Sequence, residues 1–167
     1  EVILAIMTIG AQYRFEHRNA ERMFHVSKAV LFERMSREPL FPAKQNYNSG
    51  SQEPLGISPY SNLGDQSLTQ PQVMAERTAI WKNTEITRCL LILMGYSTWE
   101  SARLVQEAFH LQGVLVRHLR EAGLKEDATR SDPRVPLDWY QWADQESRRR
   151  TKLTAFCFIH VHSIAYN

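Results

Sequence analysis

The last thirty residues, Asp138–Asn167, read DWYQWADQESRRRTKLTAFCFIHVHSIAYN, and they decide the fold of this chain. Asp138 and Gln141 have the spacing of an N-cap and its partner in a capping box, so we expect a helix to begin there. The first half of the stretch is amphipathic, and the second half is apolar at most positions. This pattern predicts one long helix whose second half is almost wholly buried.

The composition is that of a soluble globular protein. The chain has 167 residues, of which 43% are hydrophobic and 23% charged, so it can bury a substantial core. Lys and Arg number 20 against 18 Asp and Glu, which gives no electrostatic case for nucleic-acid binding. No apolar run reaches the roughly 20 residues of a membrane span. The chain starts within an apolar pattern without a signal-peptide layout, so we expect an incomplete domain, truncated at both ends.

Upstream of this stretch, apolar periodicity predicts four more helices. They are Glu1–Phe15, about Asn19–Met35, about Gln72–Met94 and Trp99–Ala122. In the first of them, the recurring apolar residues are Val2, Ile3, Ile6, Ile9 and Tyr13, with Gly10 as a point of close helix contact. The core stripe expected in the second helix is Ala20, Phe24, Ser27, Leu31 and Met35. In the third helix it is Ala79, Asn83, Ile86, Leu90 and Leu93. The fourth helix has two stripes: Leu104, Ala108, Leu111, Leu115 and Ala122, and beside them Val105, Phe109, Val116 and Leu119.

Glycines and caps predict how these helices end. Gly95 is expected to end the third helix and Gly123 the fourth. Ser97 and Glu100 have capping-box spacing, so the fourth helix is expected to begin at Trp99. The short connection predicts that the third and fourth helices are antiparallel neighbours.

The segment Leu40–Gln70 breaks the periodicity. Five of the seven prolines lie in it or directly beside it, and it is rich in Ser, Asn and Gln. Such a composition buries too little apolar surface to offset the entropy cost of ordering. We interpret residues 40–70 as a flexible loop or insertion, with partner binding through Tyr47 and Tyr60 as the alternative to a passive linker. The predicted fold class is therefore all-α: an irregular bundle of about five helices in a single domain, 1–167, with a long Pro/Ser/Asn-rich loop.

Catalytic motifs are missing from the sequence. There is no glycine-flanked serine elbow, no glycine-rich phosphate loop and no clustered acidic motif that would hold magnesium. Cys89 and Cys157 lie in apolar runs, so we expect buried thiols in a reducing compartment. The chain is predicted not to be an enzyme.

Cys157, His160 and His162 form the one group that suggests a metal site. Residues three apart share a helix face, so Cys157 and His160 could converge, whereas His162 points elsewhere. No second cluster supplies the missing ligands of a tetrahedral site, and core histidines are the preferred interpretation. His110 and His118, eight residues apart, are too distant to share a ligand.

Aromatic and basic residues have structural interpretations. The four tryptophans, Trp81, Trp99, Trp139 and Trp142, sit among apolar neighbours, so we expect core anchors and not a stacking platform. The basic run 148–150 has the composition of a nuclear import signal. Glu146 precedes Arg149 and Arg150 at helix spacings of three and four, which favours ion pairs instead.

The last helix resembles the fungal-specific transcription factor domain, a helical regulatory region that follows zinc-containing DNA-binding modules. The residues that carry the resemblance are Trp139, Trp142, Glu146, Ser147, Arg149, Arg150, Phe156 and Tyr166-Asn167. Segments Ile9–Phe15, Leu90–Trp99 and Leu104–Leu124 also look like blocks of that family, and the details are most similar to its C2H2 zinc-finger branch.

The resemblance implies a non-enzymatic regulatory and interaction domain that controls RNA polymerase II transcription in the nucleus. Trp139, Trp142, Glu146, Arg149 and Arg150 would be a structural motif that holds the last helix in the core, so removing the Arg149 side chain should destabilise the domain. No cofactor is expected in this chain, because zinc would belong to an upstream DNA-binding module that it lacks.

Expected partners are DNA through that module only, a second copy or co-regulators, and no membrane. Two alternatives remain: an all-helical enzyme of the terpenoid-synthase type and a generic helical adaptor.

Overall fold

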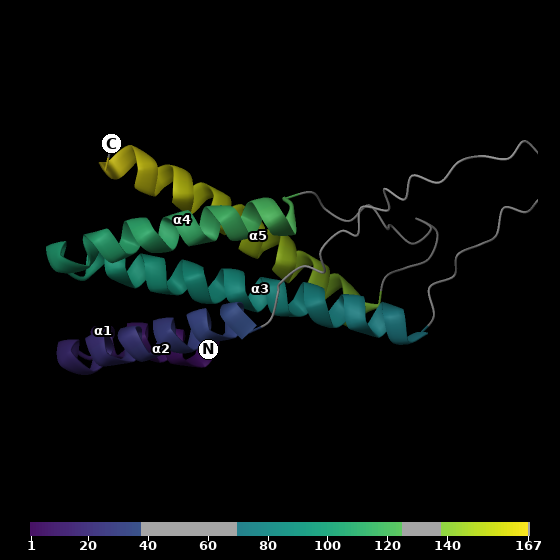
Figure 1. The fold of residues 1–167 in the computed structure, drawn as a ribbon, viewed down its shortest axis with the longest axis horizontal. Helices are drawn as coiled ribbons and strands as arrows, with labels where there is room; N and C mark the ends of the chain where they lie inside the picture. The colour runs from purple at the N-terminus through teal and green to yellow at the C-terminus, as the bar shows by residue number, and fades with distance from the viewer. Residues whose placement is uncertain (38–69, 125–137, 167) are drawn as a thin grey trace, which may run out of the picture.

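The computed structural model describes residues 1–37, 70–124 and 138–166, with residues 70–77 described by backbone alone (Figure 1). Within these ranges the chain forms five α-helices and one 3-10 turn and contains no strand, so the all-α prediction is confirmed. The elements are α1 Val2–Tyr13, α2 His17–Arg37, α3 Gln70–Trp99, the turn η1 Ala102–Leu104, α4 Val105–Ala122 and α5 Trp139–Tyr166. Of the segment 40–70 that was expected to be a flexible loop, residues 40–69 lie outside the described residues, and Gln70 is the first residue of α3. None of the described helices has the length and hydropathy that a membrane span requires.

Helix α3 is the centre of the bundle. Figure 1 shows it between the α1–α2 hairpin on one side and α4 on the other, with α5 crossing it. The stripes predicted for α2, α3 and α4 supply most of the core, because a 3.6-residue period places their apolar positions on one face. The fully buried large side chains among them are Phe24, Leu31, Ile86, Leu90, Leu93, Leu111 and Leu115. Met35, Ala79, Asn83 and Ala122, at the ends of the stripes, are only partly buried.

The turn between α1 and α2 is built on Phe15. Its φ of 62° lies in the left-handed region, which non-glycine residues adopt at a cost. The Phe15 amide donates to the Gln12 carbonyl and the Glu16 amide to the Ala11 carbonyl, both at 3.0 Å. These two bonds form a Schellman motif, so α1 ends at Tyr13, and the prediction that it reaches Phe15 is wrong by two residues.

The connection between α3 and α4 differs from the prediction. Helix α3 continues through Gly95 to Trp99, and α4 begins only at Val105, after η1. Ser97 does not cap a helix: its Oγ donates to the Leu93 and Met94 carbonyls, at 3.0 and 3.1 Å, inside α3. A serine that bonds back to its own helix stays helical, so the spacing to Glu100 was misleading. At the other end of α4, Gly123 is the C-cap with a φ of 74°, as predicted.

Helix α1 packs its small side chains inward. Ala5, Thr8 and Ala11 are its buried residues, and they face α2 and α3, the helices that α1 contacts. Small side chains let helix axes approach closely, whereas bulky ones hold them apart. The bulky apolar residues on which the helix prediction was based lie largely outside: Ile3 is 74% exposed, Ile6 55% and Tyr13 82%.

Two predictions of burial are wrong. The four tryptophans are 45% to 73% exposed, and Trp139 and Trp142 stack on each other with ring centroids 5.1 Å apart. The second half of α5 is not wholly buried, because Phe156, Val161 and Ile164 are exposed, as is the Cys157 thiol. Among the described elements, α5 packs against α3 and α4 (Figure 1), and these two helices do not cover all of its apolar circumference.

Candidate functional site

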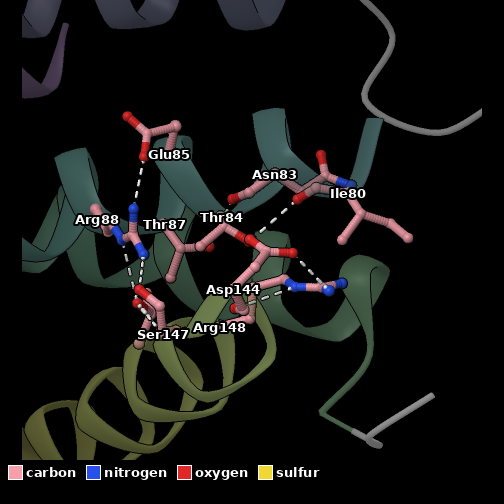
Figure 2. Close-up of polar contacts among 10 residues, drawn as sticks. Ile80, Asn83, Thr84, Glu85, Thr87, Arg88, Asp144, Ser147 and Arg148 are labelled. Atoms are coloured by element: carbon pink, nitrogen blue, oxygen red, sulfur yellow. Dashed lines mark hydrogen bonds and ion pairs between the residues drawn. The ribbon is translucent and has the colours of Figure 1, made fainter. Parts of the chain in front are cut away.

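A polar contact between α3 and α5 is made by four residues, Glu85, Arg88, Ser147 and Thr151, which we name the Arg88 bridge. Figure 2 shows Arg88 of α3 between Glu85 and Ser147. Arg88 lies on α3 among apolar residues, and its guanidinium reaches across to α5. Its Nη2 donates to Ser147 Oγ, its Nε donates to Thr151 Oγ1 at 3.2 Å, and its Nη1 pairs with Glu85 Oε1 at 2.7 Å. The planar fork of an arginine suits such a set of three acceptors in fixed directions.

Local helix geometry prepares both sides of the bridge. Glu85 and Arg88 are three residues apart on α3, and Ser147 and Thr151 are four apart on α5, so each pair shares a helix face. Thr151 Oγ1 also donates to the Ser147 carbonyl at 2.8 Å. This bond uses the hydroxyl hydrogen, so the lone pairs of Oγ1 are left to accept from Arg88. The bridge thus holds α5 against α3 at a defined register.

Glu146, next to Ser147, is the centre of the predicted ion pairs. Its carboxylate accepts from Arg149 Nε and from Arg150 Nε, both at 2.7 Å, as the helix spacing predicted. Hydrogen bonds from Arg149 and then Arg150 lower the pKa of Glu146 to about 2. Arg149 and Arg150 are 55% and 74% exposed, so the pairs lie on the solvent side of α5. Arg148 pairs in the same way with Asp144 at 2.8 Å.

The residues at the start of α5 that carry the family resemblance therefore lie on two faces of the helix. Ser147 faces α3, while Glu146, Arg149 and Arg150 form a charged surface cluster, and Trp139 and Trp142 stack at the start of the helix. Sequence reasoning did not find Arg88 or Thr151. The available signal was a lone arginine within an apolar run of α3, three residues after an acidic one.

A second polar network joins α4 to α5. Gln112 on α4 donates through Nε2 to Ser163 Oγ at 2.8 Å and to the Ile159 carbonyl at 3.4 Å. Its Oε1 lies 3.1 Å from Nδ1 of His162, which is 1% exposed and whose Nε2 has no hydrogen-bond partner among the described residues. Phe109 and Tyr166 surround that ring, at centroid distances of 5.1 and 4.7 Å. Burial lowers the pKa of His162, because desolvation disfavours the charged imidazolium.

The other histidines, His160, His118 and His110, lie in three different environments. His160 is exposed and packs edge-on against Phe156, with centroids 4.3 Å apart, so its assignment to the core was wrong. His118 is buried and its Nε2 lies 3.1 Å from the Asn83 carbonyl, while His110 stacks on Phe32. Among the residues that the structure describes, no three His, Cys, Asp or Glu side chains gather as metal ligands would.

One open pocket of about 310 Å³ lies between the ends of α2 and α4. Its lining residues are Phe32, Met35, Ser36, Arg117, His118 and Glu121. The lining combines Glu121 with two basic side chains, Arg117 and His118, and with apolar edges. The Ser36 hydroxyl in it donates to the Phe32 carbonyl of its own helix at 2.9 Å. Burial lowers the pKa of His118 in spite of its bond to the Asn83 carbonyl.

A scan against family models matches the whole chain, residues 1–167, to the family described as "Fungal specific transcription factor domain". Comparisons with curated proteins and with solved structures gave no match.

Proposed function

The chain belongs to the fungal specific transcription factor domain family, and we propose that it is the regulatory and interaction domain of a nuclear transcription factor acting on RNA polymerase II genes. The family is one of transcription-factor domains and not of enzymes. The observation that carries the proposal is the match over residues 1–167, which includes the five helices of the described ranges. The chain would control a zinc-bearing DNA-binding module, of the C2H2 type, elsewhere in the same protein.

Ion pairing on the surface supports the assignment of DNA contact to another module. The charge of the basic run on α5 is largely offset on its own helix, because Arg148 pairs with Asp144, and Arg149 and Arg150 share Glu146. An arginine that already pairs with a carboxylate neutralises a DNA phosphate less fully. It therefore displaces fewer of the counterions condensed on the DNA and adds little affinity. The two cysteines also lie on different helices, one buried on α3 and one exposed on α5, unlike a zinc-finger pair.

The Arg88 bridge supports a structural role for the family motif. Ser147 lies inside the segment Glu146–Arg150 that carries the family resemblance, and it is the residue of that segment that accepts from Arg88 of α3. The motif would thus set how α5 sits on α3, and so which side chains the domain presents to co-regulators.

A tethering experiment tests this function. The chain is fused to an unrelated DNA-binding domain in a fungal reporter strain, and transcription is compared with that of the DNA-binding domain alone. We expect the fusion to change reporter output, and we expect Arg88→Ala to reduce that change because it loosens α5. Arg150→Ala, which alters an exposed arginine, is the matched control and should behave like the parent fusion.

The purified chain supplies the second arm of the test. We expect no shift of duplex DNA at physiological salt, since DNA reading is assigned to the separate module. An unchanged reporter at equal protein levels would refute the regulatory role and favour a helical adaptor outside transcription. Tight, salt-sensitive binding of DNA by the chain alone would refute the division of labour.

A further inference from the structure

His162 of α5 is enclosed between α4 and the end of its own helix, and its side chain is 1% exposed. The ring packs against Phe109 of α4 at a centroid distance of 5.1 Å and against Phe158 and Tyr166 of α5 at 6.4 and 4.7 Å. Its Nδ1 lies 3.1 Å from Gln112 Oε1, whereas Nε2 is buried and has no hydrogen-bond partner among the described residues. A titratable ring is thus surrounded largely by aromatic side chains.

The hydrogen bonds of Gln112 determine which nitrogen of His162 carries the hydrogen. Gln112 Nε2 donates to Ser163 Oγ at 2.8 Å and to the Ile159 carbonyl at 3.4 Å. Because a carbonyl oxygen only accepts, the amide NH2 group faces Ile159 and Oε1 faces the imidazole. An amide oxygen also only accepts, so Nδ1 carries the hydrogen and donates to it. The neutral ring therefore keeps its lone pair on Nε2.

Protonation of Nε2 is unfavourable while the ring is enclosed. It creates a second N–H donor and a positive charge, and no acceptor among the described residues lies within hydrogen-bond distance of Nε2. Attraction between a cation and the surrounding aromatic rings offsets only part of the cost of removing that charge from water. The enclosed site thus favours the neutral form, and burial accordingly lowers the pKa of His162.

Within the described part of the chain, no charged side chain is placed to pair with an imidazolium at this position, and burial alone accounts for the lowered pKa. On α4, Glu107 forms an ion pair with a lysine of α2, and His110 stacks on a ring of α2. On α3, Glu100 contacts a histidine of α2. On α5, His160 is exposed to solvent. Tyr166, the titratable side chain that touches the imidazole, donates its hydroxyl hydrogen to a carbonyl of α3 at 3.2 Å.

We propose that His162 is an acid-sensitive switch: the neutral ring holds residues 156–166 of α5 on α4, and uptake of a proton from water at Nε2 releases them. The first half of α5 stays on α3, because the Arg88 bridge that holds it contains no histidine. Release separates α5 from Gln112 and Phe109 and so changes the surface that α4 and α5 present. This inference does not depend on the transcriptional function proposed above.

Proton linkage sets the size of the effect. A histidine in contact with water ionises with a pKa of about 6.5, and the enclosed His162 has a lower pKa. Release is therefore coupled to proton uptake below pH 6.5, and its equilibrium constant rises by at most about tenfold for each further pH unit. Between about pH 7.5 and pH 5.5 we expect a rise of several-fold, with about tenfold as the upper limit.

Hydrogen exchange of the full chain, followed by mass spectrometry of its peptides, measures this release. Protection factors, which correct for the effect of pH on intrinsic exchange, give the opening constant of each segment. We expect the opening constant of residues 156–166 to be several-fold larger at about pH 5.5 than at about pH 7.5, and that of residues 139–151 to stay the same.

His162→Gln removes the titrating group, and His160→Gln, at an exposed histidine of the same helix, is its matched control. The rise in the opening constant at low pH should vanish in His162→Gln and persist in His160→Gln. Gln112→Glu separates titration from packing, because it leaves the imidazole in place and gives Nδ1 a carboxylate partner. A carboxylate stabilises the imidazolium, so the rise should be smaller in this variant than in the parent chain.

A rise confined to residues 156–166, lost in His162→Gln and reduced in Gln112→Glu, supports the switch. The proposal is overturned if the opening constant of residues 156–166 is the same at both pH values, or if residues 139–151 open by the same factor. It is also overturned if the rise persists in His162→Gln or is abolished in His160→Gln. Should His162→Gln release the helix at both pH values, Gln112→Glu decides, and an undiminished rise there rules the switch out.

Discussion

Replacing Arg88 with alanine removes the side chain through which α3 holds α5. The change deletes three donated hydrogen bonds, to Ser147 Oγ, to Thr151 Oγ1 and to Glu85 Oε1. The two hydroxyl groups are only partly buried, so water can replace part of what is lost. Glu85, whose side chain is 17% exposed, loses its ion pair with the Arg88 guanidinium.

The expected loss is about 2 kcal/mol of unfolding free energy. Hydrogen bonds that involve a charged group contribute about 1.5–3 kcal/mol each when buried. Arg88 is 31% exposed, so solvent screening reduces each contribution well below that range. For a chain of this size, about 2 kcal/mol corresponds to a fall of roughly 4–8 °C in melting temperature.

Thermal and urea unfolding of a double-mutant cycle would measure this contact. Arg88→Ala, Ser147→Ala and the double variant should give a coupling of about 0.5 kcal/mol or more, because the two residues touch directly. Arg150→Ala, at a 74% exposed arginine, is the control and should unfold close to the parent chain. Additive single effects, or an Arg88→Ala variant as stable as the parent, would show that water replaces the bridge and that α5 is held by apolar packing alone.

Four further outcomes are expected. Phe15→Gly should raise the unfolding free energy by about 0.5–1 kcal/mol, since glycine adopts the positive φ of this turn without strain; chemical denaturation would show it. In the native chain a thiol reagent should modify Cys157 at once and Cys89 only after unfolding, because Cys157 is exposed and burial raises the pKa of Cys89 to about 11. Burial lowers the pKa of folded His162 below its ordinary 6.5. Its contribution to stability is therefore complete above pH 6.5 and is lost as the pH falls through 6.5 toward the lowered pKa. Between about pH 7.5 and pH 5.5, the unfolding free energy of His162→Gln should fall less steeply than that of the parent chain. Arg149→Ala should change the melting temperature by less than about 2 °C, because its pair with Glu146 is on the surface, and a larger fall would restore the core role predicted from the sequence.

Periodicity predicted the helices and most of the core because both depend on local spacing. The stripes of α2 and α4, including Phe24, Leu31, Leu111 and Leu115, are buried as the 3.6-residue period requires. Helix ends were less predictable. Gly95 has the identity of a stop signal, yet the apolar face of α3 continues to Tyr96, and packing against the neighbouring helices outweighs the cost of one glycine.

The contacts that join helices could not be read from the sequence. Arg88 could equally have pointed to solvent with Glu85, its partner at helix spacing, and only the crossing of α5 brings Ser147 to it. The tryptophans show the converse error. Trp99 is the last residue of α3 and lies between Thr98 and Glu100, so its immediate sequence neighbours are polar. Its ring is 73% exposed and lies against Phe158 of α5.

Helices α1 and α5 both expose apolar side chains, but the two faces differ in chemistry. On α5, His160 lies four residues before exposed Ile164, so a titratable group sits within that face. On α1 the stripe from Ile3 to Gly10 contains no titratable group. An apolar surface alone would therefore suffice to cover the stripe on α1. Whatever covers the face of α5 must also leave the His160 ring nitrogens a hydrogen-bond partner or contact with water, because burying a polar group without one costs free energy. The two faces thus differ in the chemistry that could cover them.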